Sequence, residues 1–151
     1  MKIIAIIVST ICIIYSTCQT QNKEGDRVAL SFMNDYVQHR YNVMRKIDNQ
    51  SDSIWILNNK YLTIHFKQSY VKLLKHYSDE GDYMDDDPIL DTNGGPDSAF
   101  VVLKTKNKNG YVKLIEYSSQ FIEIVKVKKL NNRWFVDGAG RINIPPKYQL
   151  K

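Results

Sequence analysis

The stretch AFVVLKTKNKNGYVKLIEYSSQFIEIVKVKKLNNRWFVD (residues 99–137) decides the fold of this chain. It is rich in β-branched and aromatic residues, which is typical of strands, and turn signals divide it into four runs. The runs cover residues 99–105, 111–117, 121–130 and 133–137. Asn109-Gly110 between the first two runs is the strongest short-range hairpin signal, and residues 118–120 and Asn131-Asn132 mark the later turns. The stretch therefore predicts a four-stranded antiparallel meander.

Three helices are expected before this sheet. Asp26 is a suitable N-cap for the first, Ser51 or Ser53 for a short second helix, and Thr63 for a third that ends by Gly81. Apolar residues recur at helical spacing in the two longer segments, and Trp55 and Leu57 belong to the short one. The expected buried stripes are Ala29, Phe32, Met33, Tyr36, Val37, Tyr41 and Met44, and then Phe66, Tyr70, Leu73, Leu74 and Tyr77.

An antiparallel sheet packs one face and leaves the other wet. Lysines at 104, 106, 113, 126 and 128 suit the wet face, so the preceding helices must cover the opposite face. The sequence therefore predicts an α+β layer pair, with N-terminal helices on a curved antiparallel sheet.

The N-terminal segment indicates export. Lys2 precedes an apolar run from Ile3 to Ile14, and Tyr15-Ser16-Thr17-Cys18 follows. A charged start, a short apolar core and a small-residue exit are typical of a signal peptide. The apolar run is well short of the roughly 20 residues of a spanning helix, which disfavours a membrane anchor of that kind.

Cys18 is the predicted lipidation site. Residues 15–18 resemble the box that ends bacterial lipoprotein signals, although Tyr15 replaces the usual aliphatic residue; the alternative is ordinary cleavage after Cys18. The chain's other cysteine, Cys12, lies inside the signal, so the exported domain would hold neither a disulfide nor a thiolate metal site. We therefore expect residues 1–18 to be a signal peptide, 19–25 a flexible tether and 26–151 one domain.

Charge is unevenly distributed. The formal net charge of +5 falls to +4 when the signal with Lys2 is removed. The segment 79–97 carries eight acids and no Lys or Arg, and its composition predicts a long loop. Such a loop is a candidate contact surface for a protein partner, whereas scattered lysines in an exported protein do not indicate nucleic-acid binding.

The acidic segment contains no recognisable metal motif. Asp91, Asn93 and Gly95 partly match the opening of an EF-hand loop, but Pro96 replaces its glycine and Val102 its closing glutamate, so that loop is excluded. The three histidines are too dispersed for a zinc motif, and no nucleophile signature is present. We expect no metal site, no cofactor and no recognisable catalytic residue.

Five residues are candidates for lining a pocket or fixing loops. Pro88 stiffens the backbone between Asp87 and Asp91, so these carboxylates either form an acid/base pair or accept backbone N–H bonds. Asp137 either points into a pocket, facing Asp87 or Tyr111, or caps the turn that Gly138 and Gly140 permit. Trp134, like the tyrosines, either packs in the core or lines an aromatic pocket. The candidates are Asp87, Asp91, Tyr111, Trp134 and Asp137.

Several of these motifs together resemble the bacterial DUF3828 family. They are Tyr61-Leu62-Thr63 before the third helix, Asp87-Pro88-Ile89-Leu90-Asp91 after it, and the closing Trp134-Phe135-Val136-Asp137-Gly138-Ala139-Gly140. The resemblance covers nearly all of residues 26–145. It implies an NTF2-like cone with a pocket at its mouth, in exported or lipid-anchored proteins of uncharacterised activity. It supplies no catalytic residues.

Three functions remain open at this point. The first is an envelope lipoprotein, held to the membrane by an N-terminal lipid such as palmitate, whose domain binds a partner or ligand without catalysis. The second is a small periplasmic enzyme, a hydrolase or isomerase, with Asp87, Asp91 or Asp137 as general base. The third is an immunity or inhibitor protein against a secreted toxin.

Overall fold

The computed structural model describes residues 2–81, 86–92, 98–103 and 109–149, without the side chains of residues 2–22. Three helices precede the sheet: α1 (Lys2–Met44), α2 (Asp52–Asn58) and α3 (Ile64–Glu80). The strands are β1 (Phe100–Val102), β2 (Tyr111–Glu116), β3 (Phe121–Leu130) and β4 (Arg133–Ala139), and a 3-10 turn η1 (Pro146–Tyr148) follows.

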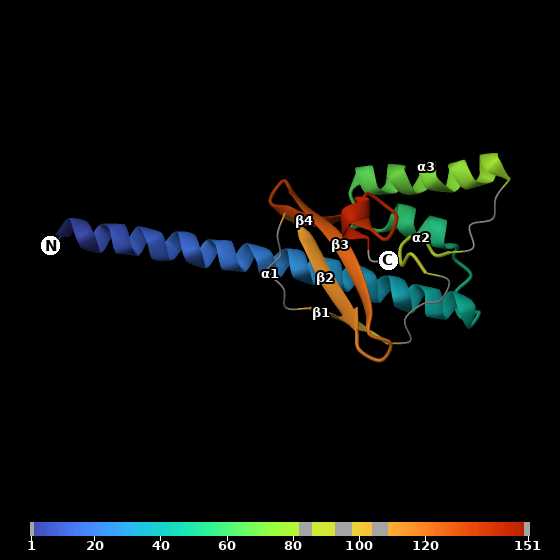
Figure 1. Ribbon diagram of the computed structural model, residues 1–151, viewed down its shortest axis with the longest axis horizontal. Coiled ribbons are helices and arrows are strands. Elements are labelled where there is room, and N and C mark those ends of the chain that lie inside the picture. The colour runs from blue at the N-terminus through green and yellow to red at the C-terminus, as the bar shows by residue number, and fades with distance from the viewer. Residues whose placement is uncertain (1, 82–85, 93–97, 104–108, 150–151) are drawn as a thin grey trace.

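The four strands form one antiparallel sheet in the order β1-β2-β3-β4. Helix α1 crosses one face of the sheet and contacts all four strands, and its N-terminal half extends beyond the sheet (Figure 1). Helix α3 packs beside β4 and α2. The predicted α+β architecture with a meander is therefore confirmed, and the sheet is open rather than closed into a barrel.

Local signals determine most boundaries. The Ser51 hydroxyl caps α2, the Thr63 hydroxyl accepts the N–H of Phe66 to cap α3, and Gly81 ends α3 with a φ of 68°. Asn131 and Asn132 both have positive φ, as a tight two-residue hairpin turn requires. These are the residues that the sequence marked as caps and turns.

The first helix differs from its prediction at both ends. It does not begin at an Asp26 cap but runs continuously from Lys2, and Gly25 lies within the helix, where it packs against Trp134 and Val127. At the other end Tyr41 and Met44 are exposed, because α2 meets α1 before these positions: Trp55 stacks on His39, and Asp52 bonds to Arg40. The division at Cys18 and the tether at 19–25 stay predictions, since the helix describes the uncleaved chain.

The strands differ less from prediction. β1 is shorter than residues 99–105, and 104–108, with two of the predicted wet-face lysines, lie outside the described residues. β4 continues two residues beyond Asp137, because Gly138 and Ala139 still pair with β3. In the described part of the chain, no helix combines the length and apolar character needed to cross a bilayer.

The core lies between α1 and the inner face of the sheet. Its largest fully buried side chains come from both layers, and the segment between α3 and β1 adds to them. They are Phe32, Met33, Tyr36, Ile56, Phe66, Ile89, Phe100 and Leu114. The acidic segment thus contributes Ile89 and Leu90 to the core, as the sequence predicted, and this brings its carboxylates close to the sheet.

Candidate functional site

The candidate site lies where β4 leaves β3. β3 spans ten residues, but its pairing with β4 begins only at Val125, which faces Ala139. Gly140 then turns the chain away with a φ of 52°. A Cβ at this position would overlap the carbonyl oxygens of Pro88 and Ile89, so only glycine fits the contact with the acidic segment.

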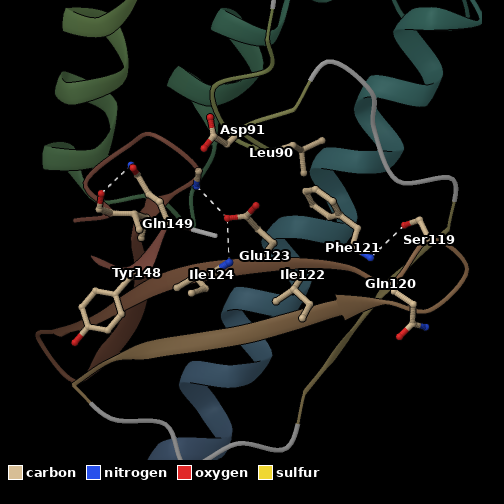
Figure 2. Close-up of a pocket in the computed structure, with 12 residues that line it drawn as sticks. Leu90, Asp91, Ser119, Gln120, Phe121, Ile122, Glu123, Ile124, Tyr148 and Gln149 are labelled. Carbon is tan, nitrogen blue, oxygen red and sulfur yellow. Dashed lines mark hydrogen bonds between the residues drawn. The ribbon is translucent and has the colours of Figure 1, made fainter. Parts of the chain in front are cut away.

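A pocket of about 490 Å³ fills the space beside the first residues of β3 (Figure 2). This volume is within the range of small-molecule sites. The acidic segment, β3 with the turn before it, and the C-terminal segment supply its walls. The lining residues are Leu90, Asp91, Ser119, Gln120, Phe121, Ile122, Glu123, Ile124, Gly140, Ile144, Tyr148 and Gln149.

Glu123 is the chemically distinctive residue of this pocket. The residue is 6% exposed, and its Oε1 accepts the backbone N–H groups of Ile124 and Gly140 at 3.0 and 3.1 Å. Burial raises the pKa of Glu123 to about 8, the two N–H bonds oppose this rise, and the charges of Asp91 and Asp87 add to it. Among the described residues, no Lys or Arg forms an ion pair with it.

Burial therefore favours the protonated, neutral form of this acid near pH 7. Because Oε1 of Glu123 already accepts two N–H bonds, the proton belongs on Oε2, on the side of the carboxyl that faces away from these donors (Figure 2). A protonated carboxyl donates one hydrogen bond, and it becomes an anion when a cation approaches. The pocket thus offers either a donor or a latent negative charge.

A second buried glutamate in the sheet, Glu116, behaves in the opposite way. Hydroxyls of Ser118, Ser119 and Ser98 donate to the Glu116 carboxylate, and so do the backbone N–H groups of Ser118 and Ser119 at 3.0 and 2.8 Å. These bonds hold the pKa of Glu116 far below its usual range. The number of donors decides the charge: Glu116 is stabilised as an anion, whereas Glu123 is not.

Asp91 is the one residue of the predicted set that lines the pocket. The Arg141 guanidinium donates to Asp91 through Nε at 2.5 Å, to the Asp86 carboxylate, and to the Tyr77 hydroxyl at 3.1 Å. Hydrogen bonds to these partners, led by Asp91, raise the pKa of Arg141 further. The arginine thereby joins the acidic segment, the end of α3 and the turn after β4 into one wall.

Asp87 lies behind that wall and fixes the backbone. Its Oδ1 accepts the N–H groups of Ile89 and Leu90 at 2.8 and 3.1 Å, and its Oδ2 accepts the Tyr36 hydroxyl at 2.8 Å. Arg40 approaches the same Oδ2 at 3.3 Å. Burial, together with the charge of Asp87, raises the pKa of Tyr36, so this phenol stays a donor. Of the two roles that the sequence allowed for Asp87, acid/base catalysis or loop fixation, its hydrogen bonds match loop fixation.

Asp137 lies away from the pocket, at the start of α3. Its carboxylate accepts hydrogen bonds from Thr63 Oγ1 at 2.8 Å and Lys126 Nζ at 3.0 Å, and His65 Nδ1 is 3.3 Å away. Burial opposes the charge of Asp137, but the bonds from Lys126 and Thr63 outweigh it and lower its pKa. Asp87, Asp91 and Asp137 therefore do not converge on one cavity.

The two aromatic candidates also lie outside the pocket wall. Tyr111 stacks on Tyr148 with ring centroids 4.2 Å apart, and Tyr148 is the residue that reaches the pocket. Trp134 packs against Gly25 and is partly buried, and its Nε1 has no hydrogen-bond partner among the described residues. Cys18 lies in the part of α1 whose side chains are outside the description.

Glu123 was missed at the sequence level, although a signal for it exists. In the run 121–130 it stands between Phe121 and Val125, two apolar residues on the same face of the strand. Period two therefore assigns this carboxyl to the buried face, where it needs a partner or a proton. No metal-binding group of three or more His, Cys, Asp or Glu side chains is found among the residues that the structure describes.

The chain matches no protein-family model, no curated protein and no solved structure. The resemblance to DUF3828 consequently stays a prediction, and the pocket must be interpreted from its own chemistry.

Proposed function

We propose that this protein is an exported, lipid-anchored binding domain of the bacterial envelope, and that the pocket at Glu123 is its ligand site. The observation that carries the proposal is a buried acid, uncompensated by a cation among the described residues, in a pocket of about 490 Å³ with largely apolar walls. A few placed polar groups in an apolar cavity are typical of binding sites. The ligand we expect either accepts a hydrogen bond from Glu123 or brings a positive charge to it.

The N-terminal segment supports the proposed location in the cell envelope. A signal peptide that ends at Cys18 would attach the domain to the membrane through a lipid, facing the periplasm or the cell surface. The three-helix and meander arrangement is compatible with an NTF2-like domain and hence with the DUF3828 resemblance. A protein partner would then meet the acidic segment 79–97, whose Leu90 and Asp91 form part of the pocket rim.

A fragment screen by NMR tests whether the pocket binds ligands. The full chain carrying Cys18→Ser, which removes the acylated thiol, is screened against small amines, amides and carboxylic acids. Ile122→Trp fills the pocket, whereas Lys128→Trp adds the same ring to an exposed position of the same strand. Shifts at pocket residues that Ile122→Trp abolishes and Lys128→Trp preserves support the proposal. Fragments that bind equally to both variants, or no fragment binding to the parent protein, contradict it.

Lipid anchoring at Cys18 can be tested separately from ligand binding. The chain with Cys18 should incorporate labelled palmitate and sediment with membranes, whereas the Cys18→Ser variant should do neither. Unchanged membrane partitioning of the variant would contradict lipid anchoring.

A catalytic role is the second candidate, and Glu123 is the observation that favours it. A carboxyl with a pKa near neutrality inside a pocket is suited to general acid–base chemistry. The aspartates are less suited to this role, because Asp87 and Asp137 are saturated by other partners. The immunity-protein alternative calls for an exposed acidic patch, and among the described acids Asp86 and Asp91 are bonded to Arg141.

A further inference from the structure

The pocket coincides with a sheet edge that lacks a neighbour. Of the ten residues of β3, the first four have no partner on the side of β4, because β4 turns away at Gly140. Among the strands that the structure describes, none takes that place. The pocket therefore occupies the position that a longer β4 would fill.

The backbone of this edge points toward the position of the missing strand, although the Ile124 N–H is bonded to Glu123. The Ile124 N–H points toward the missing neighbour, where Glu123 Oε1 receives it together with the Gly140 N–H. Since N–H and C=O directions alternate along a strand, the N–H and C=O of Ile122 point the same way. An unpaired strand edge of this kind is a template for an extended segment.

The pocket walls limit the length of the segment that can bind along this edge. Tyr148 and Gln149 stand at one end of the edge, and the turn with Ser119 and Gln120 stands at the other (Figure 2). Four residues of β3 span roughly 13 Å, which suits a segment of three to five extended residues.

We propose that the pocket binds an extended peptide segment of a protein partner, which adds to the open edge of β3 antiparallel to it and continues the line of β4. All strand pairs in this sheet are antiparallel, and that pairing is the more stable of the two. The proposal rests on the function proposed above, and it specifies the ligand class. Strand addition is a general mode of peptide recognition in which main-chain bonds provide affinity and alternate side chains provide specificity.

The side-chain pattern of the peptide follows from the two faces of β3. The peptide residue opposite Glu123 has its side chain on the face of Glu123 and Asp91 (Figure 2). A lysine or arginine at this position would favour the ionised form of Glu123 and pair with it. Its two neighbours have their side chains on the opposite face of the strand, with Ile122 and Ile124, and should be apolar. The expected motif is apolar-basic-apolar.

The probe is the peptide acetyl-Thr-Val-Lys-Val-Thr-amide, titrated into the full Cys18→Ser chain and followed by NMR. In the antiparallel register its lysine pairs with Glu123 and its second valine with Ile122. N-methylation of that valine removes the hydrogen bond to Ile122, and a loss of one such bond weakens binding by about tenfold. N-methylation of the lysine, whose N–H points away from β3, should leave affinity within about twofold. Replacement of the lysine by glutamate should also weaken binding by about tenfold.

Two results would overturn strand addition. One is equal weakening by both N-methyl groups. The other is that the peptide does not bind, although the pocket still binds small fragments and Ile122→Trp abolishes that fragment binding. The pocket would then be a ligand site as proposed, but its ligand would not be an extended peptide. Failure of both peptides and fragments would instead contradict the proposed function itself.

Discussion

Replacement of Glu123 by glutamine should make the protein more stable at neutral pH, although it alters a buried residue of the central sheet. The glutamine side chain keeps the oxygen that accepts the N–H groups of Ile124 and Gly140, and its amide N–H₂ takes the place of the acid O–H. The size and shape of the side chain are preserved. What the substitution removes is the ability to ionise.

The size of the effect follows from the pKa of Glu123. It is about 8 in the fold, against an ordinary value of 4.5, so the folded protein holds a proton that the unfolded chain releases between these pH values. Unfolding is therefore favoured increasingly as pH rises from 4.5 to 8, by about 1.4 kcal/mol for each pH unit. At pH 7 the accumulated loss of stability is on the order of 3 kcal/mol, and glutamine does not incur it.

The assay is urea unfolding of the Cys18→Ser chain with and without Glu123→Gln, between about pH 4.5 and 8.5, the range that brackets both pKa values of this acid. The difference between the two proteins cancels the titration of the other groups. It should be small at the acid end and grow in favour of the glutamine variant as the pH approaches 8. Glu116→Gln is the matched control of opposite sign, because the hydrogen bonds that lower the pKa of Glu116 stabilise the fold above pH 4.5 and are lost only below it. Across the assayed range this variant should therefore be less stable than the parent by a nearly constant amount. A difference for Glu123→Gln that does not change with pH would refute the conclusion that this acid is neutral.

Three further substitutions test the supports of the pocket, each by chemical denaturation. Gly140→Ala should destabilise the fold by at least about 1 kcal/mol, because alanine is strained at the positive φ of this position. The loss should be larger than this, because the new Cβ would overlap the carbonyl oxygen of Pro88. An unchanged free energy of unfolding would contradict the tight turn at Gly140. Tyr36→Phe should cost about 2 kcal/mol by removing the hydroxyl bond to the Asp87 carboxylate, and a loss below a few tenths would show that Asp87 does not depend on it. Thr63→Ala should destabilise the fold by about 1–2 kcal/mol, because the cap of α3 and the hydrogen bond to Asp137 are both lost. Thr63→Ser keeps the hydroxyl and should retain most of the stability. If the serine variant is as unstable as the alanine variant, the hydroxyl is not the cause.

The sequence predicted what local chemistry determines. The Ser51 and Thr63 caps, the Gly81 stop and the Asn131-Asn132 turn each depend on residues within four positions. The bounds of β3 follow from the same kind of signal, since turn residues flank one continuous run. The meander and the layer pair then follow from short connections and the alternation of buried and exposed residues.

Contacts between segments far apart in the chain could not be predicted from local sequence signals. Arg141 meets Asp91, Asp86 and Tyr77, which lie 50 to 64 positions away in the chain, and nothing in the local sequence indicates this set. The exposure of Tyr41 depends on where α2 ends its cover of α1. The pocket itself arises because β4 stops four residues short of the start of β3, which is a tertiary property.

The candidate residues divide along the same line. Asp87 and Asp91 were recognised from Pro88 and the two apolar residues between them, and the structure separates their roles into loop fixation and pocket wall. Glu123 could have been found from its alternation with Phe121 and Val125, but its protonation depends on how few donors the fold brings to it. Both glutamates are buried, and the number of donors is what distinguishes Glu123 from Glu116.

A ¹³C NMR titration of the Glu123 side-chain carboxyl in the full Cys18→Ser chain tests the central claim most directly. The pocket as described predicts a midpoint near pH 8, and a downward shift of that midpoint when the lysine-containing probe peptide is bound, because a cation favours the ionised form. A midpoint near 4.5 in the free protein would contradict the account, since Glu123 would then be an ordinary solvated carboxylate rather than the neutral acid of a binding pocket.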